Sequence, residues 1–191
     1  WDNNNIRNLN TLLGANLDWI LEEVGDLAKL IPYRYPNHET FKELGLQIVD
    51  LGWFLGDWSF RANGAYAVAD GMDPRSESPE ESGDPSFVSC LDEDWVSVNQ
   101  IIKYYKFGFG KATDYLNEEI RFERLTRKEA ISIAEKYDGT CDKKLIQTFC
   151  NYIDISVDQF WNKVINFTNT DLFYIGAGNN IRPNFKVGIG L

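Results

Sequence analysis

The feature that most constrains this fold is a series of amphipathic helical segments between Asp92 and Phe167, separated by glycines and by polar helix starts. In the first segment the apolar side chains recur at helical spacing, and Gly108 and Gly110 then interrupt it. A second segment follows directly, again with its apolar side chains on one stripe. The first stripe comprises Trp95, Val98, Ile102 and Tyr105, and the second comprises Ala112, Leu116 and Ile120. This pattern predicts a mainly α fold with minor β structure.

Two capping boxes indicate where later helices begin. The hydroxyl of Thr126 can accept the amide of Glu129 while the Glu side chain bonds back, and Ser156 has the same relation to Gln159. The helix after Thr126 is expected to end at Gly139 and to bury Ala130, Ile133, Ala134 and Tyr137. The next helix is expected over residues 142–153. The helix after Ser156 is expected to bury Phe160, Val164 and Phe167.

In the N-terminal part of the chain, the sequence pattern predicts shorter helices and a strand. Helical spacing covers residues 8–30, with possible interruptions at Gly14 and Gly25, and a short helix follows Asn37. The apolar and β-branched stretch 46–55 is the best candidate for a strand. A further short helix is expected over residues 62–70.

We expect residues 1–191 to form a single C-terminal domain with four successive parts. These parts are a helical and strand part (1–71), an acidic surface loop rich in Pro and Ser (72–90), a helical part (91–170), and a Gly- and Asn-rich tail (171–191) with a short strand at 185–189. The chain begins with Trp1 instead of Met, so we expect it to be a portion of a larger polypeptide.

Charge and cysteine content narrow the class of protein. A formal net charge of −10 and a pI near 4.6 argue against general binding to nucleic acid or anionic membranes, because phosphates are repelled. The apolar runs are too short for membrane insertion. Cys90, Cys141 and Cys150 are odd in number and widely spaced, which favours a reduced, cytoplasmic chain with buried structural thiols. With His38 as its one histidine, the sequence predicts no metal site.

The segment KFGFGKATD, residues 106–114, is the main candidate for ligand binding. Its glycines allow close approach of the backbone, a helix start presents free amides, and Lys111 can neutralise an anion. The segment matches neither standard glycine-rich phosphate motif, so a plain helix–helix corner is the alternative interpretation. Trp53 and Trp58 are candidates for stacking on a sugar or a base, with core packing as the alternative.

The sequence does not identify a catalytic group. Glu118 and Glu119 are adjacent on a helix and therefore point about 100° apart, whereas Glu119 and Glu123 share a face that we interpret as solvated. There is no G-x-S-x-G elbow, and a single histidine leaves little room for triad chemistry. The catalytic residues therefore stay unknown at this stage.

The ordered combination KFGFGKATD, EIR, LTRKEA and EKYDG resembles the C-terminal signature of the N-acetyl sugar amidotransferases, a PP-loop family of LPS and O-antigen biosynthesis. The resemblance runs from about residue 44 to residue 167 and is densest at 106–121 and 125–139. The chain departs from the family pattern at Lys111, where Arg is common, and at Asn99, where His is common. The second departure removes a possible proton carrier.

This resemblance implies that the chain is a helical C-terminal domain, detached from the N-terminal α/β PP-loop domain of an ATP-dependent enzyme. No SGGKDS-like loop occurs in the chain. In the full-length enzyme the N-terminal domain would bind ATP and activate the acetamido group of a nucleotide-activated N-acetyl sugar as an adenylate. Ammonia from a glutaminase subunit would then displace AMP and leave an acetamidino group. The fragment by itself is expected to be inactive, and no cofactor is assigned to it.

The same resemblance, taken with the residues, selects candidates for substrate or phosphate binding. They are Lys106, Gly108, Gly110, Lys111, Thr113, Asp114, Arg121, Trp53 and Trp58. Two other classes of function stay open. One is a non-catalytic helical protein-interaction module, and the other is a sugar-nucleotide-binding module without activation chemistry.

Overall fold

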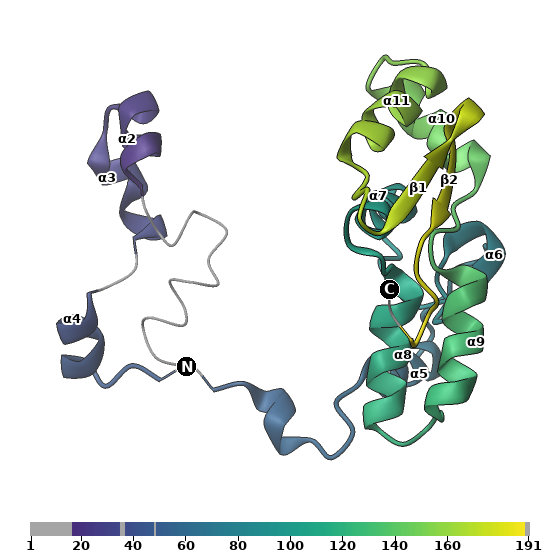
Figure 1. The fold of residues 1–191 in the computed structure, drawn as a ribbon. Coiled ribbons are helices and arrows are strands. Elements are labelled where there is room, and N and C mark those ends of the chain that lie inside the picture. The colour runs from purple at the N-terminus through teal and green to yellow at the C-terminus, as the bar shows by residue number, and fades with distance from the viewer. Residues whose placement is uncertain (1–16, 35–36, 48, 190–191) are drawn as a thin grey trace. The chain divides into compact units, whose positions relative to one another are not determined.

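The boundary between two units of the chain lies between Gly56 and Asp57 in the computed structural model, which describes residues 17–34, 37–47 and 49–189. Unit 1 comprises residues 1–56 and unit 2 comprises residues 57–191. The described residues are mainly α-helical with minor β structure, as predicted (Figure 1). In this described part of the chain, every helix is too short or too polar to span a bilayer. The expectation that residues 1–191 act as one C-terminal domain stays a prediction.

The described part of unit 1 contains short helices. They are α2 (Asp18–Val24), α3 (Leu27–Leu30), η1 (Ile31–Tyr33), α4 (His38–Glu43) and η2 (Leu51–Phe54). Asp26 and Asn37 accept backbone amides at the starts of α3 and α4, and Gly25 ends α2 in the left-handed conformation. The predicted interruption at Gly25 is therefore confirmed, while Gly14 lies outside the described residues.

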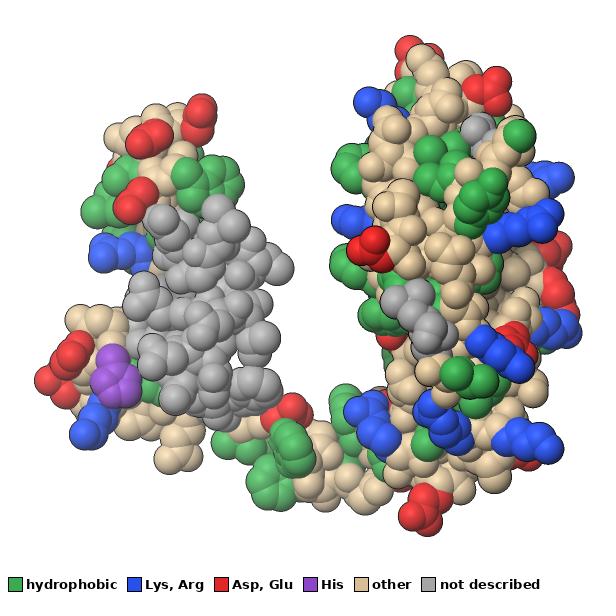
Figure 2. Space-filling model, viewed as in Figure 1, with side chains coloured by type: hydrophobic (Ala, Val, Ile, Leu, Met, Phe, Trp, Pro, Cys, Tyr) green, Lys and Arg blue, Asp and Glu red, His purple; other side chains and the backbone are tan. Residues whose placement is uncertain are grey.

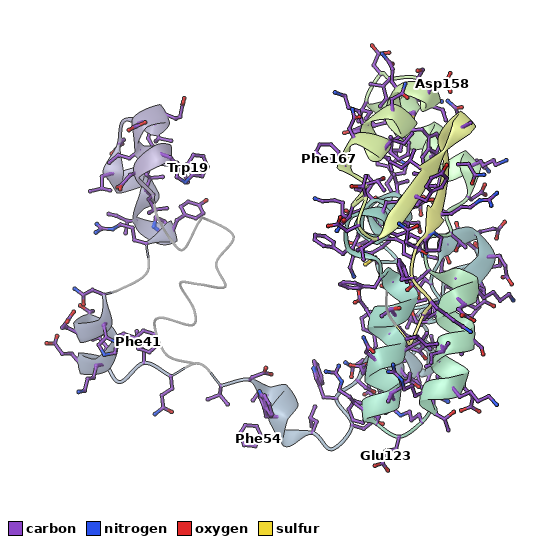
Figure 3. All side chains as sticks on the ribbon, in the orientation of Figure 1. Trp19, Phe41, Phe54, Glu123, Asp158 and Phe167 are labelled. Carbon is purple, nitrogen blue, oxygen red and sulfur yellow. The ribbon has the colours of Figure 1, made fainter. Side chains whose placement is uncertain are left out.

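The strand predicted over residues 46–55 is wrong. The 3-10 helix η2 occupies Leu51–Phe54, and the carboxylate of Asp50 begins it by accepting the Gly52 amide at 3.1 Å. This local hydrogen bond competes with an extended backbone. The side chain of Trp53 is 83% exposed. That of Phe54 is 77% exposed (Figure 3), so the apolar composition of this segment does not reflect burial among the described residues.

The first helix of unit 2 is α5, whose N-cap Ser59 accepts the Ala62 amide. Its elements are α5 (Phe60–Ala69), α6 (Pro79–Ser82), α7 (Val96–Phe107), α8 (Lys111–Arg121), α9 (Arg127–Tyr137), α10 (Lys143–Tyr152), α11 (Val157–Phe167), β1 (Phe173–Gly176), η3 (Ala177–Asn179) and β2 (Asn180–Pro183). Both predicted capping boxes are present and begin α9 and α11. Local sequence signals therefore set these helix starts correctly.

Two clusters of buried side chains lie in the described part of unit 2. Helices α7, α10 and α11 contribute Val98, Ile146, Cys150, Phe160 and Val164 to the first. Helices α8 and α9, side by side in Figure 1, contribute Ala112, Leu116, Ala130 and Ala134 to the second. The predicted stripes are confirmed except at two helix ends. Ile153, predicted on the stripe of the helix over 142–153, follows the end of α10 and is 42% exposed, and Phe167 is 62% exposed because it is the last residue of α11 and projects from the surface (Figure 3).

The tail forms a hairpin in which β1 pairs antiparallel with β2. Phe173 lies opposite Pro183 and is buried against the rings of Tyr104 and Tyr105. The strand predicted at 185–189 is wrong. Strand β2 ends at Pro183, and Gly188 adopts a φ of 80°, which is incompatible with extended backbone.

The acidic loop predicted over residues 72–90 folds around a buried cation. The side chain of Arg75 is 5% exposed and donates hydrogen bonds to the carbonyl of Cys90, to that of Glu93 at 3.1 Å and to the Asp94 carboxylate at 3.3 Å. The helix α6 lies within the loop and has its own capping box. This loop is therefore a structured part of unit 2, with Arg75, Ser82, Asp84 and Ser89 buried.

The three cysteines occupy different environments. Cys150 is buried in the first cluster and Cys141 is half-buried, and burial raises the pKa of both thiols, that of Cys141 to about 12. Cys90 is exposed and free. The prediction of buried structural thiols is therefore wrong for Cys90, because the loop that carries it passes over the surface with a left-handed φ of 50° at this residue.

Candidate functional site

The corner between α7 and α8 has the glycine-dependent geometry that the sequence indicates. Gly108 ends α7 with a φ of 80°, and a Cβ at this position would lie 3.2 Å from the Leu172 side chain. Gly110 is the N-cap of α8, and a Cβ there would lie 2.9 Å from Oδ1 of Asp138. Both glycines therefore allow close packing within the chain.

The carboxylate of Asp138 binds the first turn of α8. Oδ1 of Asp138 accepts the Thr113 amide at 3.2 Å, and Oδ2 accepts the Thr113 hydroxyl. Asp138 directly follows α9, so this contact fixes the end of α9 against the first turn of α8. A carboxylate is stabilised at this position because amides at a helix N-terminus are partly positive.

Lys111 points away from that corner toward the loop before α7. Its ammonium donates to the hydroxyl of Ser89, lies 3.5 Å from Sγ of Cys90, and lies 5.9 Å from the centroid of the Phe60 ring. Ser89 is buried, at 1% exposure. The ammonium is therefore held between α5, α8 and the loop.

A pocket of about 210 Å³ lies beside this ammonium. It is lined by Phe60, Ser86, Gln100, Lys111, Asp114, Tyr115, Glu118 and Arg121. Of the predicted binding residues, it therefore brings together Lys111, Asp114 and Arg121. These residues share one wall because α8 presents them at helical spacing.

The polar groups of this pocket are not all satisfied within the chain. Asp114 pairs with Lys103, and Oε2 of Glu118 accepts the Phe60 amide at 2.6 Å. Arg121, in contrast, is exposed and forms no hydrogen bond or ion pair with the described residues. Oε1 of Gln100 is buried without a hydrogen-bond partner among them. The exposed guanidinium of Arg121 is thus available to a polar ligand.

The other predicted residues lie outside the lining of this pocket. The Lys106 ammonium lies 5.5 Å and 5.9 Å from the ring centroids of Phe107 and Phe167. Trp58 is 56% exposed near the start of unit 2, and Trp53 is exposed in unit 1. Lys106 and the two tryptophans therefore stay separate candidates for contact with a ligand or partner.

Sequence reasoning missed a buried carboxylate at this site. Glu119 is 1% exposed, and its two oxygens pair with Arg61 at 3.1 Å and Arg124 at 2.9 Å. The solvated face predicted for Glu119 and Glu123 is therefore wrong at Glu119, whereas Glu123 is exposed in the turn after α8 (Figure 3). No local signal identifies the pairing, since Arg61 lies 58 residues away in the sequence.

The ionic network around Glu119 extends to the first residues of unit 2. Arg124 also donates to Asp57 and to the hydroxyl of buried Ser59. Hydrogen bonds from Ser59 and from Arg124 lower the pKa of the Asp57 carboxyl. Together with the Glu118 contact, this network holds the start of α5, and so the Phe60 ring, beside the pocket.

The charged side chains of unit 2 are mixed in sign on the face shown in Figure 2. Within the described residues, no group of three or more His, Cys, Asp or Glu side chains is arranged to hold a metal ion. The pocket therefore offers cations, carboxylates, an amide and aromatic rings as its means of recognition.

A comparison with models of protein families gives a match. Residues 86–181 match the family described as "LPS biosynthesis protein WbpG-like, C-terminal domain". The matched segment contains α7 to α11 and the wall of the pocket that α8 provides. A search of curated proteins gave no match.

Proposed function

The chain belongs to the family of WbpG-like C-terminal domains of LPS biosynthesis proteins, and from this premise we propose that it is the C-terminal portion of an N-acetyl sugar amidotransferase. The proposed enzyme converts the acetamido group of a nucleotide-linked sugar to an acetamidino group, in an ATP-dependent reaction of O-antigen synthesis in the cytoplasm. The order of the motifs around residues 106–139 supports this assignment.

The observation that carries the proposal is the pocket beside α8. Lys111 and Arg121 supply positive charge suited to a sugar-nucleotide phosphate, and the rings of Phe60 and Tyr115 suit the apolar face of a sugar. Asp114 offers acceptors for sugar hydroxyls. At about 210 Å³ the pocket is smaller than typical small-molecule sites of roughly 300–1,000 Å³. It would therefore hold part of the substrate, with the remainder bound by the PP-loop domain.

In this proposal the chemical steps are divided between partners. The PP-loop domain binds ATP and transfers AMP to the acetamido oxygen, and a glutaminase subunit supplies the ammonia that displaces AMP. The residues of this chain bind and orient the nucleotide-activated N-acetyl sugar. The 191-residue chain by itself is then expected to bind the nucleotide sugar without releasing AMP or pyrophosphate.

The best test uses Arg121→Gln in the full-length enzyme with its glutaminase. Arg121 has no partner among the described residues, so its loss should leave the melting temperature unchanged. Loss of a charge-assisted contact to phosphate should lower kcat/KM for the nucleotide sugar about tenfold. The control is Lys128→Gln, which removes an exposed cation from α9, outside the pocket lining.

Two results would contradict the proposal. One is an unchanged kcat/KM in both Arg121→Gln and Lys111→Ala, which would remove the pocket from substrate binding. The other is release of AMP and pyrophosphate by the isolated chain, which would show that the activation chemistry lies within these residues. Binding of the nucleotide sugar with no amidine product in the full-length enzyme would instead favour a sugar-nucleotide-binding module.

A further inference from the structure

Unit 2 carries an exposed aromatic surface where α7 and α11 end. The side chains of Phe107, Phe109 and Phe167 are 56%, 40% and 62% exposed. The ring centroids of Phe107 and Phe109 lie 6.3 Å apart. The Lys106 ammonium lies 5.5 Å from the Phe107 centroid and 5.9 Å from that of Phe167. The three rings and Lys106 therefore form one continuous surface, the phenylalanine patch.

The phenylalanine patch is positively charged. Lys106 is exposed and forms no hydrogen bond or ion pair with the described residues. Lys103 lies at the edge of the patch, 4.5 Å from the Phe109 ring centroid, and is paired with Asp114. Contiguous exposed apolar surface marks interaction sites on soluble proteins. The unpaired ammonium favours a partner that brings a carboxylate together with apolar side chains.

A segment with this chemistry lies at η2 of unit 1. The side chains of Leu51, Trp53 and Phe54 are 73%, 83% and 77% exposed, and Phe54 projects from the ribbon in Figure 3. The exposed Asp50 begins η2 and forms no ion pair with the described residues. Residues 44–60 contain no Lys or Arg. This segment therefore presents apolar side chains beside a carboxylate and no competing cation.

The phenylalanine patch and η2 complement each other in composition and in charge. A lysine ammonium is attracted to the face of a tryptophan ring, and aromatic rings pack favourably edge to face. Each copy of the chain carries both surfaces, so two copies can exchange them reciprocally in a closed two-fold dimer. The net charge of −10 on each copy opposes this contact only weakly at physiological ionic strength, where charges are screened over about 8 Å.

We propose that the chain forms a homodimer in which η2 of each copy docks on the phenylalanine patch of the other copy. Trp53 and Phe54 pack against the rings of the patch, and the Asp50 carboxylate pairs with the Lys106 ammonium. Few side chains of each copy take part, so the dimer is weak and dissociates on dilution. For the same reason it adds little to the stability of the fold at low protein concentration.

Sedimentation velocity of the 191-residue chain, over micromolar to submillimolar concentrations, tests the proposal. The unchanged chain should pass from monomer to dimer over this range. Trp53→Ser should raise the dissociation constant about thirtyfold, as for loss of an aromatic anchor from an interface. Lys106→Glu should raise it about tenfold, because this change places a carboxylate opposite Asp50.

Matched substitutions outside both surfaces serve as controls. Tyr66→Ser removes a side chain that is 79% exposed on α5, and Lys128→Glu reverses the charge of an exposed lysine on α9. Both variants should dimerise as the unchanged chain does. Circular dichroism checks the fold of each variant, and Trp53→Ser should keep its fold because the Trp53 side chain is largely exposed.

A chain that stays monomeric over the whole concentration range would overturn the proposal, and this measurement needs no variant. A dimer that either Trp53→Ser or Lys106→Glu leaves intact would overturn it as well, since both surfaces are required. The same holds if the controls weaken the dimer as much as these two changes do. None of the measurements requires sugar or ATP, so their outcome is independent of the proposed amidotransferase function.

Discussion

Glu119 is a carboxylate that unit 2 buries almost completely. It is buried on α8 between Arg61 and Arg124, which are 58% and 19% exposed in their side chains. A buried carboxylate is costly to desolvate unless it is paired and hydrogen-bonded. The two guanidinium groups provide that compensation and link α5, α8 and the turn after α8.

We expect Glu119→Ala to destabilise the chain by about 2–3 kcal/mol, because it removes both ion pairs and leaves a cavity. The estimate is at the low end for buried pairs, since water can reach Arg61 in the variant. Urea denaturation followed by circular dichroism measures the change. The control is Glu135→Ala, which removes an exposed carboxylate from α9. Equal midpoints for the two variants would show that the Glu119 pairs contribute nothing.

At the scale of single elements, the capping box at the start of α9 is the clearest local determinant of structure. The Thr126 hydroxyl accepts the Glu129 amide, and the Glu129 carboxylate accepts the Thr126 amide at 2.9 Å. The Thr126 hydroxyl also donates a hydrogen bond to this carboxylate at 2.6 Å, and this bond, followed by that of the Thr126 amide, lowers the pKa of Glu129. Helix α9 therefore begins at a defined residue, and this start aligns Ala130 and Ala134 with α8.

Thr126→Ala should cost about 1 kcal/mol of stability through the lost cap. Ser132→Ala, at an exposed position inside the same helix, should change stability by less than Thr126→Ala does, because Ala favours the helix interior. Thermal denaturation of both variants makes the comparison. If Thr126→Ala melts at the temperature of the unchanged chain, the cap is not a determinant of α9.

Helix packing gives a second expectation for α9. Ile133 packs against the cluster of α8 and α9 but is only half-buried. Ile133→Ala should therefore cost about 2 kcal/mol, the lower end of the range for such truncations. Ile131 packs close to Gly188 of the tail, so Ile131→Ala tests whether the tail also depends on this helix. A denaturation midpoint unaffected by Ile133→Ala would contradict the packing.

At the scale of the whole molecule, the buried apolar side chains are concentrated in unit 2. Both clusters of buried side chains in the described residues consist of unit 2 residues, whereas buried apolar residues described in unit 1 are Leu17 and Leu30. Because burial of apolar surface is the main stabilising contribution to folding, unit 2 should carry most of the stability.

A fragment of residues 57–191 should therefore unfold cooperatively, close to the melting temperature of the 191-residue chain. Retaining Asp57 keeps its contact with Arg124. Differential scanning calorimetry of the fragment and the whole chain measures both transitions. A non-cooperative or strongly lowered transition in the fragment would show that unit 1 is needed for the fold of unit 2.

The sequence by itself determined the helices of unit 2 and their buried stripes. Helical spacing predicted α7 to α11, and the two capping boxes predicted the starts of α9 and α11. These features are predictable because their hydrogen bonds join residues only three or four positions apart. The corner at Gly108 and Gly110 was predictable for the same reason.

Only the tertiary structure decided which side chains meet at the pocket and which carboxylate is buried. Glu119 pairs with Arg61, and Lys111 meets Ser89 and Cys90, across 58, 22 and 21 positions of sequence. Such contacts depend on how α5 and the acidic loop pack against α8. The sequence pattern reports the amphipathic face of a helix but not its neighbour, so burial of a charge and exposure of a thiol become visible only once the helices are packed together.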